Sequence, residues 1–453
     1  MERRIRLSQC MIVKNEEMNI ERALSWGREM MWEQIVVDTG STDRTVEIAE
    51  RMGAKVYHFS WIDDFAAAKN YAIEQAEGDW IAFLDADEYL SPEDVKKLPA
   101  MLSKLSKDGY HALVASWIQV EGGEVFQKDG EGGLGWRESL RADGSRGISL
   151  AGTQIRFFCR RPDLRYRGRI HEKLYLEKGE LRPWDGSREI SILHTGYTDS
   201  EMETKNKVER NIALVKKELE ARPDDYQMMT YLGDSYFQQK KLEESAYWYE
   251  QAVLHLPGQL EKNQIQGAMI FKHLLVIYGD DFSKAQKAYE KAVRRFPKDG
   301  DFDYLMGRNC AAAERYEEGA AHLLQGIGLL DRYEGNGLSV LLGRNLLEAW
   351  ELLTRCYYET GNLEQCANCA VTILRADPWR EETLKILLMA FKRDEELAKE
   401  RERAGKPGKK AAAPGQVLTF LRNFYQLQED AAWQMVRRAA EAAEYEGLLQ
   451  ELS

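Results

Sequence analysis

Several features that mark particular classes of protein are scarce or missing in this sequence. Only six of its 453 residues are cysteines, which is too few for a disulfide framework and is typical of reduced thiols in a cytoplasmic protein. No apolar run approaches 20 residues, so we expect no membrane span. The first ten residues, MERRIRLSQC, hold no hydrophobic core or cleavage site, so no secretory signal is predicted. Basic residues are outnumbered 63 to 75, and the net charge of -12 argues against general nucleic-acid binding.

The length of 453 residues suggests two or three domains, and the N-terminal part has the pattern of an α/β domain. Strand-like runs alternate there with amphipathic helical segments such as 18–30 and 43–52. This alternation predicts a mostly parallel sheet covered by helices. A glycine-rich stretch, 122–152, breaks the pattern and predicts a mobile loop, and short strands are expected again over 153–197. The predicted strands of the first part are 7–13, 34–40, 55–59, 80–86 and 112–120.

From about residue 205 the sequence changes to long helical periodicity with an internal repeat. The tetratricopeptide pattern has W-x2-L-G-x2-Y in one helix and A-x3-F followed by P in the next, in units of about 34 residues. Three further, weaker units follow the first, with prolines at Pro257, Pro297 and Pro378. We therefore predict an all-α repeat domain over 205–400. The first unit has Met229, Leu232, Gly233, Tyr236, Ser245, Tyr249, Ala252 and Pro257 at the repeat spacings.

The last part of the chain has no chemical motif. Residues 401–415 are basic and rich in Gly, Pro and Ala, which predicts an exposed linker. Residues 416–453 have helical apolar spacing and are predicted to form capping or self-association helices, so a homodimer is expected. Cys366 and Cys369 form a C-x-x-C pair inside the fourth repeat, where packing explains them better than metal or redox chemistry.

Two predicted strands of the first part end in carboxylates. Asp38 ends the strand in VVDTGSTD (36–43), and Asp85 and Asp87 follow the apolar strand in FLDADEYL (83–90). Ligands of open α/β sheets bind at the carboxyl ends of the strands. A D-x-D pair of hard oxygens suits Mg²⁺ or Mn²⁺ bridging a diphosphate. Each motif alone also fits a helix cap, but together they favour a nucleotide and metal site.

Four motifs, in this order and spacing, resemble those of the family 2 glycosyltransferases with a GT-A fold: MIVKNEE, VVDTGSTDRT, WIDDFAAAKN and DWIAFLDADE. The subgroup that the chain resembles is bacterial and has C-terminal tetratricopeptide repeats. It includes transferases that glycosylate peptides and proteins, among them the S-glycosyltransferases of glycopeptide bacteriocins. The resemblance covers residues 6–200 by motif and implies an α/β GT-A domain, Rossmann-like and nucleotide-sugar-binding, over 1–204.

The resemblance also implies how the donor would be held. The main chain from Val13 to Asn15 and the carboxylate of Asp38 would hold the nucleobase, usually uracil. Lys69 and Asn70 would lie near the nucleotide, although the family often has arginine where this chain has Lys69.

The same resemblance implies a divalent metal, Mn²⁺ or Mg²⁺, at the D-x-D motif. Asp85 would face the ribose or the water shell of the metal, and Asp87 would bind the metal directly. His194, in ILHTGY, matches the C-terminal histidine of the family, which commonly completes the metal shell or touches the phosphates.

The segment 155–174 has seven basic and two acidic residues, which fits either a patch that attracts a diphosphate or a solvated hairpin. Within it, GRIHE resembles the stretch where family members have the acid that activates the acceptor. Glu172 would take the acceptor proton in an inverting transfer. His171 could instead neighbour the metal or the sugar.

The sequence therefore predicts an inverting glycosyltransferase that uses a UDP-sugar and Mn²⁺ or Mg²⁺. Because repeat stacks form concave surfaces that hold peptides, the expected acceptor is a Ser, Thr or Cys side chain of a peptide or protein. Two alternatives stay open. The acceptor could be a lipid-linked or cell-wall saccharide, or the chain could be a repeat scaffold with an inactive GT-A domain.

Overall fold

The computed structural model describes residues 5–119, 137–140, 146–149, 151–194, 201–258, 260, 264–333, 338–408, 410–427 and 429–453. The chain divides into two compact units, residues 1–223 and 224–453. None of the helices in these described ranges is long and apolar enough to cross a membrane.

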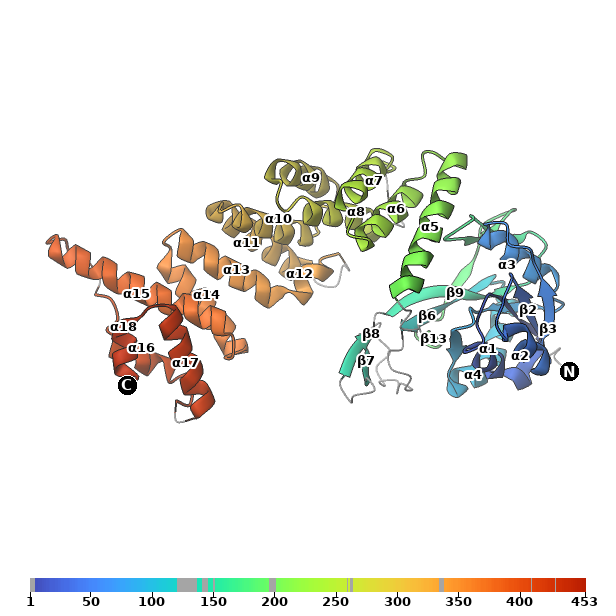
Figure 1. Ribbon diagram of the computed structural model, residues 1–453, viewed down its shortest axis with the longest axis horizontal. Helices are drawn as coiled ribbons and strands as arrows, with labels where there is room; N and C mark the ends of the chain where they lie inside the picture. The colour runs from blue at the N-terminus through green and yellow to red at the C-terminus, as the bar shows by residue number, and fades with distance from the viewer. Residues whose placement is uncertain are drawn as a thin grey trace. The chain divides into compact units, whose positions relative to one another are not determined.

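A nine-stranded mixed sheet forms the centre of the first unit (Figure 1). Eight strands lie in the order β3-β2-β1-β4-β9-β6-β13-β5, and β12 pairs with β6. The first four run parallel, as the sequence predicts, and β9 enters antiparallel between β4 and β6. The strands are β1 (Leu7–Val13), β2 (Met31–Asp38), β3 (Lys55–His58), β4 (Trp80–Phe83), β5 (Glu88–Leu90), β6 (Ala112–Gln119), β9 (Ala151–Cys159), β12 (Pro183–Asp185) and β13 (Ser191–His194).

Helices cover both faces of this sheet, since alternate side chains of each buried strand point to opposite faces. One face packs on α1 (Ile20–Ser25), α2 (Thr45–Arg51) and α4 (Pro92–Lys107). The other face packs on α3 (Phe65–Glu74) and on the hairpin of β10 (Leu164–Arg167) and β11 (Lys173–Leu176). A 3₁₀ turn, Arg28–Met30, precedes β2. This covered sheet confirms the predicted α/β class.

Most of the segment 122–152, predicted as a mobile loop, lies outside the described residues. Within it, β7 (Arg137–Leu140) pairs antiparallel with β8 (Arg146–Ser149), and β9 begins at Ala151. The prediction of a loop is therefore wrong for these stretches.

Helix α5 (Glu201–Ala221) belongs to the first unit, although its periodicity matches the helical half. Glu218 accepts a hydrogen bond from the backbone N–H of Arg169 (3.2 Å), and Lys217 forms an ion pair with Asp63. The predicted domain boundary at 204 stays a prediction, and the compact units divide after Pro223.

The second unit is helical, and its first helices pack in consecutive pairs such as α6 with α7, α10 with α11 and α13 with α14 (Figure 1). Gly233 shows why the repeat has a small residue in its first helix. A Cβ at Gly233 would lie 2.5 Å from the ring of Tyr249, and Ser245 donates a hydrogen bond to the Gly233 carbonyl at 2.9 Å. In the predicted repeat, the backbone of one helix thus contacts side chains of the next. These helices are α6 (Tyr226–Gln238), α7 (Leu242–Leu254), α8 (Gln264–Ile277), α9 (Phe282–Arg295), α10 (Asp301–Ala312), α11 (Tyr316–Arg332), α12 (Val340–Arg344), α13 (Leu346–Glu359), α14 (Leu363–Ala376) and α15 (Glu381–Arg403).

The C-terminal helices α16 (Pro414–Leu421), α17 (Asp430–Ala442) and α18 (Glu446–Glu451) share a core with α14 and α15. Their apolar side chains therefore pack against other helices of the same chain, which is what a capping role requires. Within the predicted linker 401–415, α15 continues to Arg403 and α16 begins at Pro414. Cys366 and Cys369 are both buried, and burial raises the pKa of Cys366 to about 12, which fits the packing role.

Candidate active site

The loops that follow β1 and β2 are tied together around Asp38. Asp38 ends β2 opposite Val13 in the register, and its carboxylate accepts the backbone N–H groups of Gly40 (3.1 Å) and Ser41 (3.0 Å). Burial acts to raise the pKa of Asp38, but the hydrogen bonds from Ser41 and Gly40 outweigh it and lower the pKa. Asn15, at φ 58°, accepts the N–H of Thr42 at 2.8 Å. The structure therefore brings together Val13, Asn15 and Asp38, the predicted nucleobase residues.

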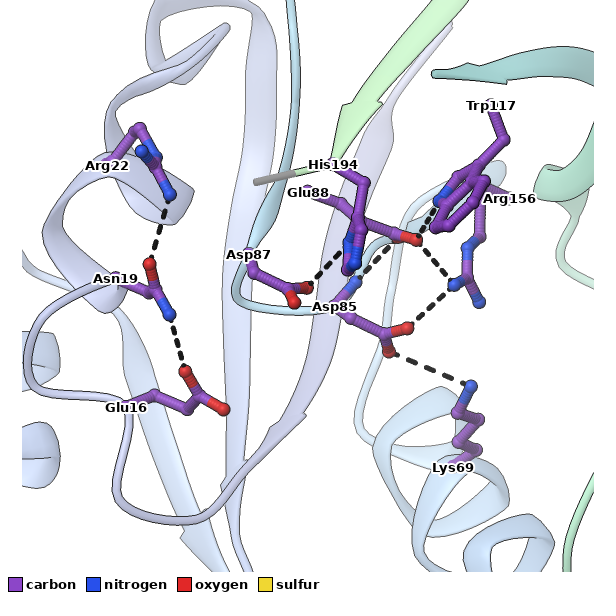
Figure 2. A network of polar contacts seen from close by, with 10 residues as sticks. All are labelled: Glu16, Asn19, Arg22, Lys69, Asp85, Asp87, Glu88, Trp117, Arg156 and His194. Atoms are coloured by element: carbon purple, nitrogen blue, oxygen red, sulfur yellow. Dashed lines mark hydrogen bonds and ion pairs between the residues drawn. The ribbon is translucent and has the colours of Figure 1, made fainter. Parts of the chain in front are cut away.

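The turn after β4 places Asp85 against an arginine that the sequence did not single out. Arg156, on β9, lies 2.6 Å from both Asp85 Oδ2 and Glu88 Oε1 (Figure 2). Burial raises the pKa of Asp85, but Arg156 and then Lys69 outweigh it and lower the pKa to about 2. Glu88 is buried, and burial followed by the charge of Asp85 raises its pKa. Arg156 is what allows two carboxylates to lie side by side here.

Asp87 points away from Arg156 and toward His194 at the end of β13. His194 Nδ1 lies 3.3 Å from Asp87 Oδ1, and its ring lies against Trp117, with ring centroids 4.7 Å apart (Figure 2). Burial lowers the pKa of His194, but the hydrogen bond and charge of Asp87 outweigh it, and the net shift is upward. The two predicted metal ligands are therefore neighbours.

This pair has the chemistry of a partial metal site. Carboxylate and imidazole are ligands that Mn²⁺ accepts, and Mg²⁺ is usually held by one or two carboxylates with substrate phosphates and water in the other positions. Among the described residues, no group of three or more His, Cys, Asp or Glu side chains is placed to hold an ion. Asp87 and His194 would therefore supply two ligands of a metal, and the other ligands would come from a diphosphate and water.

Glu172 pairs with Lys69, which faces the carboxylate oxygen of Asp85 that Arg156 does not contact. Lys69 Nζ, on α3, lies 2.7 Å from Glu172 Oε1 and 3.8 Å from Asp85 Oδ1. Asn70, the next residue, exchanges two 2.9 Å hydrogen bonds with the main chain of Tyr166 on β10. The side chain of Asn70 is therefore engaged with the backbone of the hairpin that leads to Glu172.

A second group that the sequence did not single out, the carboxylate of Glu16, lies in the loop after β1. Glu16 accepts a hydrogen bond from Asn19 at 2.8 Å, and Arg22 donates to Asn19 at 3.0 Å (Figure 2). The pKa of Glu16 is raised by burial, against the Asn19 hydrogen bond, and further by the charges of Asp87 and Asp85. The carboxylate of Glu16 is therefore repelled by the negative charges of Asp85 and Asp87, so the loop after β1 and the turn after β4 interact electrostatically.

The comparison with protein families agrees with this geometry. The family model described as glycosyl transferase family 2 matches residues 8–164. The first unit contains a glycosyl transferase family 2 domain. The model described as tetratricopeptide repeat matches residues 206–259 and 276–334. The predicted resemblance is confirmed for both parts. The family 2 match covers the predicted site residues from Val13 to Asp87 and ends before Glu172 and His194.

Two relatives of the chain are named after one or the other of these parts. A TPR repeat-containing protein of Synechococcus elongatus is 30% identical over 253 residues, which are 54% of this chain and 56% of that protein. The SPbeta prophage-derived glycosyltransferase SunS of Bacillus subtilis is 23% identical over 296 residues, which are 65% of this chain and 64% of that protein. The chain thus spans less than two thirds of the length of both relatives.

A solved structure of a synthase is similar to part of the chain. Glucosyl-3-phosphoglycerate synthase from Mycobacterium tuberculosis, in complex with Mn²⁺ and uridine-diphosphate-glucose, is 26% identical. The match covers 25% of this chain and 44% of that chain, with a TM-score of 0.22. A likeness at this score says nothing about the activity of the chain.

Proposed function

We propose that the chain is an inverting, metal-dependent glycosyltransferase that moves a hexose or N-acetylhexosamine from a UDP-sugar to a peptide or protein. One observation supports it above all: the predicted metal and base residues, with Lys69 and Asp85, belong to one network of contacts that runs through Trp117, Glu88 and Arg156. Asp87 pairs with His194 at 3.3 Å, and Asp85 in the same turn faces Lys69, which pairs with Glu172 at 2.7 Å.

In this proposal each group has a separate task. Asp38, ionised and fixed by two backbone N–H groups, accepts hydrogen bonds from the base of the nucleotide. Asp87 and His194 would hold the metal, which when bound stabilises the charge that develops on the leaving diphosphate. Glu172 takes the proton of the acceptor as the acceptor attacks the anomeric carbon.

The acceptor is proposed to be a Ser, Thr or Cys side chain held by the repeats. Tetratricopeptide units bury their apolar faces on neighbouring units and present an extended surface, which suits a peptide. Mass spectrometry of candidate acceptors after incubation tests this part, and a modified lipid-linked or cell-wall saccharide would replace the peptide proposal.

The test of the reaction is UDP release from UDP-glucose, UDP-N-acetylglucosamine and UDP-galactose, with and without Mn²⁺. Asp87→Ala should abolish metal-dependent release without unfolding the domain, since losing one metal contact costs several kcal/mol of transition-state stabilisation. Asp108→Ala, at the exposed end of α4, is the matched control and should behave as wild type. Asp87→Ala activity near wild type would remove Asp87 from the site. A wild-type chain that neither binds UDP nor turns over any of these sugars would instead favour a scaffold with an inactive domain.

A further inference from the structure

Lys69 is buried between two carboxylates, so a nucleotide phosphate could pair with its ammonium only by displacing one of them. Its side chain is 5% exposed, and its ammonium is shared by Glu172 at 2.7 Å and Asp85 at 3.8 Å. The rings of Phe83 and Tyr166 lie on it, each 5.2 Å from the nitrogen. Burial would lower the pKa of Lys69, but the charges of Asp85 and Glu172 outweigh it and raise the pKa, so the ammonium stays charged.

The turn that presents Glu172 is held by α3 through several contacts. Phe65 N–H donates to the Arg169 carbonyl at 2.8 Å, and Asn70 fixes Tyr166 at the start of the turn. The turn itself needs unusual backbone: Gly168 has φ 101° and His171 has φ 52°. Because the main chain is fixed in this way, the Lys69 ion pair selects where the Glu172 carboxylate points within the turn.

We propose that Lys69 is a positioning residue for the acceptor side of the reaction, which holds the Glu172 carboxylate in place, and that it is not a ligand of the nucleotide. The inference rests on the proposed function, because Glu172 is there the base. It departs from the role near the nucleotide that the family resemblance implies for Lys69. The geometry also makes Lys69 the link between Asp85 on the donor side and Glu172 on the acceptor side.

The first test separates the two roles of Lys69 by kinetics on the full chain. Lys69→Met should lower kcat for UDP release from a UDP-sugar by about 100-fold, at the lower end of what general-base catalysis contributes, and leave KM within about threefold. Lys69→Arg keeps the charge and should recover at least about tenfold of the lost kcat. A variant Lys69→Met with unchanged kcat and a KM raised about tenfold would make Lys69 a nucleotide ligand and overturn the inference.

Lys55→Met is the matched control. Lys55 also forms a 2.7 Å ion pair with a buried glutamate, Glu33, in the same unit but at the start of β3. Lys55→Met should leave kcat and KM unchanged. A loss of kcat in Lys69→Met would then be due to the position of its ion pair near Glu172 and not to the removal of a buried ion pair in general.

The second test asks whether Lys69 acts through Glu172, and it also covers the case in which Lys69→Met unfolds the domain. The pair Glu172→Gln and Glu172→Gln/Lys69→Met leaves no unpaired Glu172 charge in the site. Since residues that act as a unit are not additive, the added Lys69→Met change should then lower kcat less than about threefold. A further loss of about 100-fold would overturn the inference. A wild-type chain that releases no UDP from any sugar nucleotide overturns the proposed function, and this inference with it, whereas an active wild type matched by Lys69→Met overturns this inference alone.

Discussion

Each unit of the chain buries a lysine against two carboxylates, but the two clusters are closed to different degrees. The open cluster of the first unit is Lys69, Asp85 and Glu172, and the closed cluster of the second unit is Lys272, Asp299 and Asp301. In the open cluster Asp85 remains 40% exposed. In the closed cluster Lys272 lies 2.8 Å from Asp299 and 2.6 Å from Asp301, and neither aspartate side chain is more than 1% exposed.

The partners of the carboxylates explain this difference. Asp301 accepts the backbone N–H groups of Leu341 (3.1 Å) and Leu342 (2.7 Å) at the start of α12, and Lys272 also donates to the Leu338 carbonyl at 2.9 Å. The polar groups of the closed cluster therefore bind the protein backbone. The open cluster lies beyond the carboxyl end of β4, where ligands of α/β sheets bind. A buried ion pair is thus no mark of a site until its position and remaining exposure are known.

The open cluster should be broken most strongly by Glu172→Gln. The amide keeps the shape of the side chain but cannot take a proton, so kcat for UDP release should fall by about 10²–10⁴ while UDP binding stays near wild type. Steady-state kinetics and calorimetry with UDP measure the two quantities. The same calorimetry on Asp108→Ala provides the baseline. An unchanged kcat in Glu172→Gln would show that another residue is the base.

The closed cluster should respond in stability instead of turnover. Lys272→Met leaves Asp299 and Asp301 buried without their cation, and breaking a buried pair in this way costs about 3–5 kcal/mol. Denaturant unfolding followed by circular dichroism measures the loss, and UDP release below the transition should stay at the wild-type rate. The control Lys284→Met removes an exposed lysine of α9 and should change stability by less than about 0.5 kcal/mol. Equal stability of Lys272→Met and Lys284→Met would contradict the account of the closed cluster.

The sequence could predict residues that lie in local motifs, but not residues that the fold brings to the site from elsewhere in the chain. Asp38, Asp87 and Glu172 lie in local motifs, and their roles remain predictions. Asp38 ends β2 as expected, and Asp87 lies in the turn between β4 and β5. Arg156 could not be found in this way. Its strand, β9, comes late in the chain and pairs antiparallel between β4 and β6. The alternating arginines of the segment 155–174 also fit a solvated hairpin. The repeats were easier to predict, because Gly233 and Tyr249 meet within one local unit.

The smallest expected effect is that replacing Asp299 of the closed cluster stabilises the protein in a pH-dependent way. Burial, only partly offset by Lys272, raises the pKa of Asp299 to about 6, above the value near 3.9 of an unfolded aspartate. The folded state therefore holds a proton that the unfolded state has lost between these values, so stability falls as pH rises from about 4 through about 6.

Asp299→Asn removes this charge and keeps an oxygen to accept the N–H of Asp301. At pH 7.5 it should raise the free energy of unfolding by at least about 1 kcal/mol, since one unit of pKa difference is worth about 1.4 kcal/mol. At pH 4 the gain should vanish. Thermal unfolding at the two pH values measures it, and an equal gain at both would exclude titration of Asp299 as the cause.

The central claim is that the carboxyl ends of the first-unit strands hold a sugar nucleotide and its metal. A crystal of the full chain grown with UDP and Mn²⁺, with diffraction recorded at a wavelength where manganese scatters anomalously, tests this claim most directly. The account predicts one anomalous peak at bonding distance from Asp87 and His194, with the diphosphate completing the shell and the uracil against Asp38. Manganese bound away from Asp87, or UDP bound away from Asp38, would contradict it.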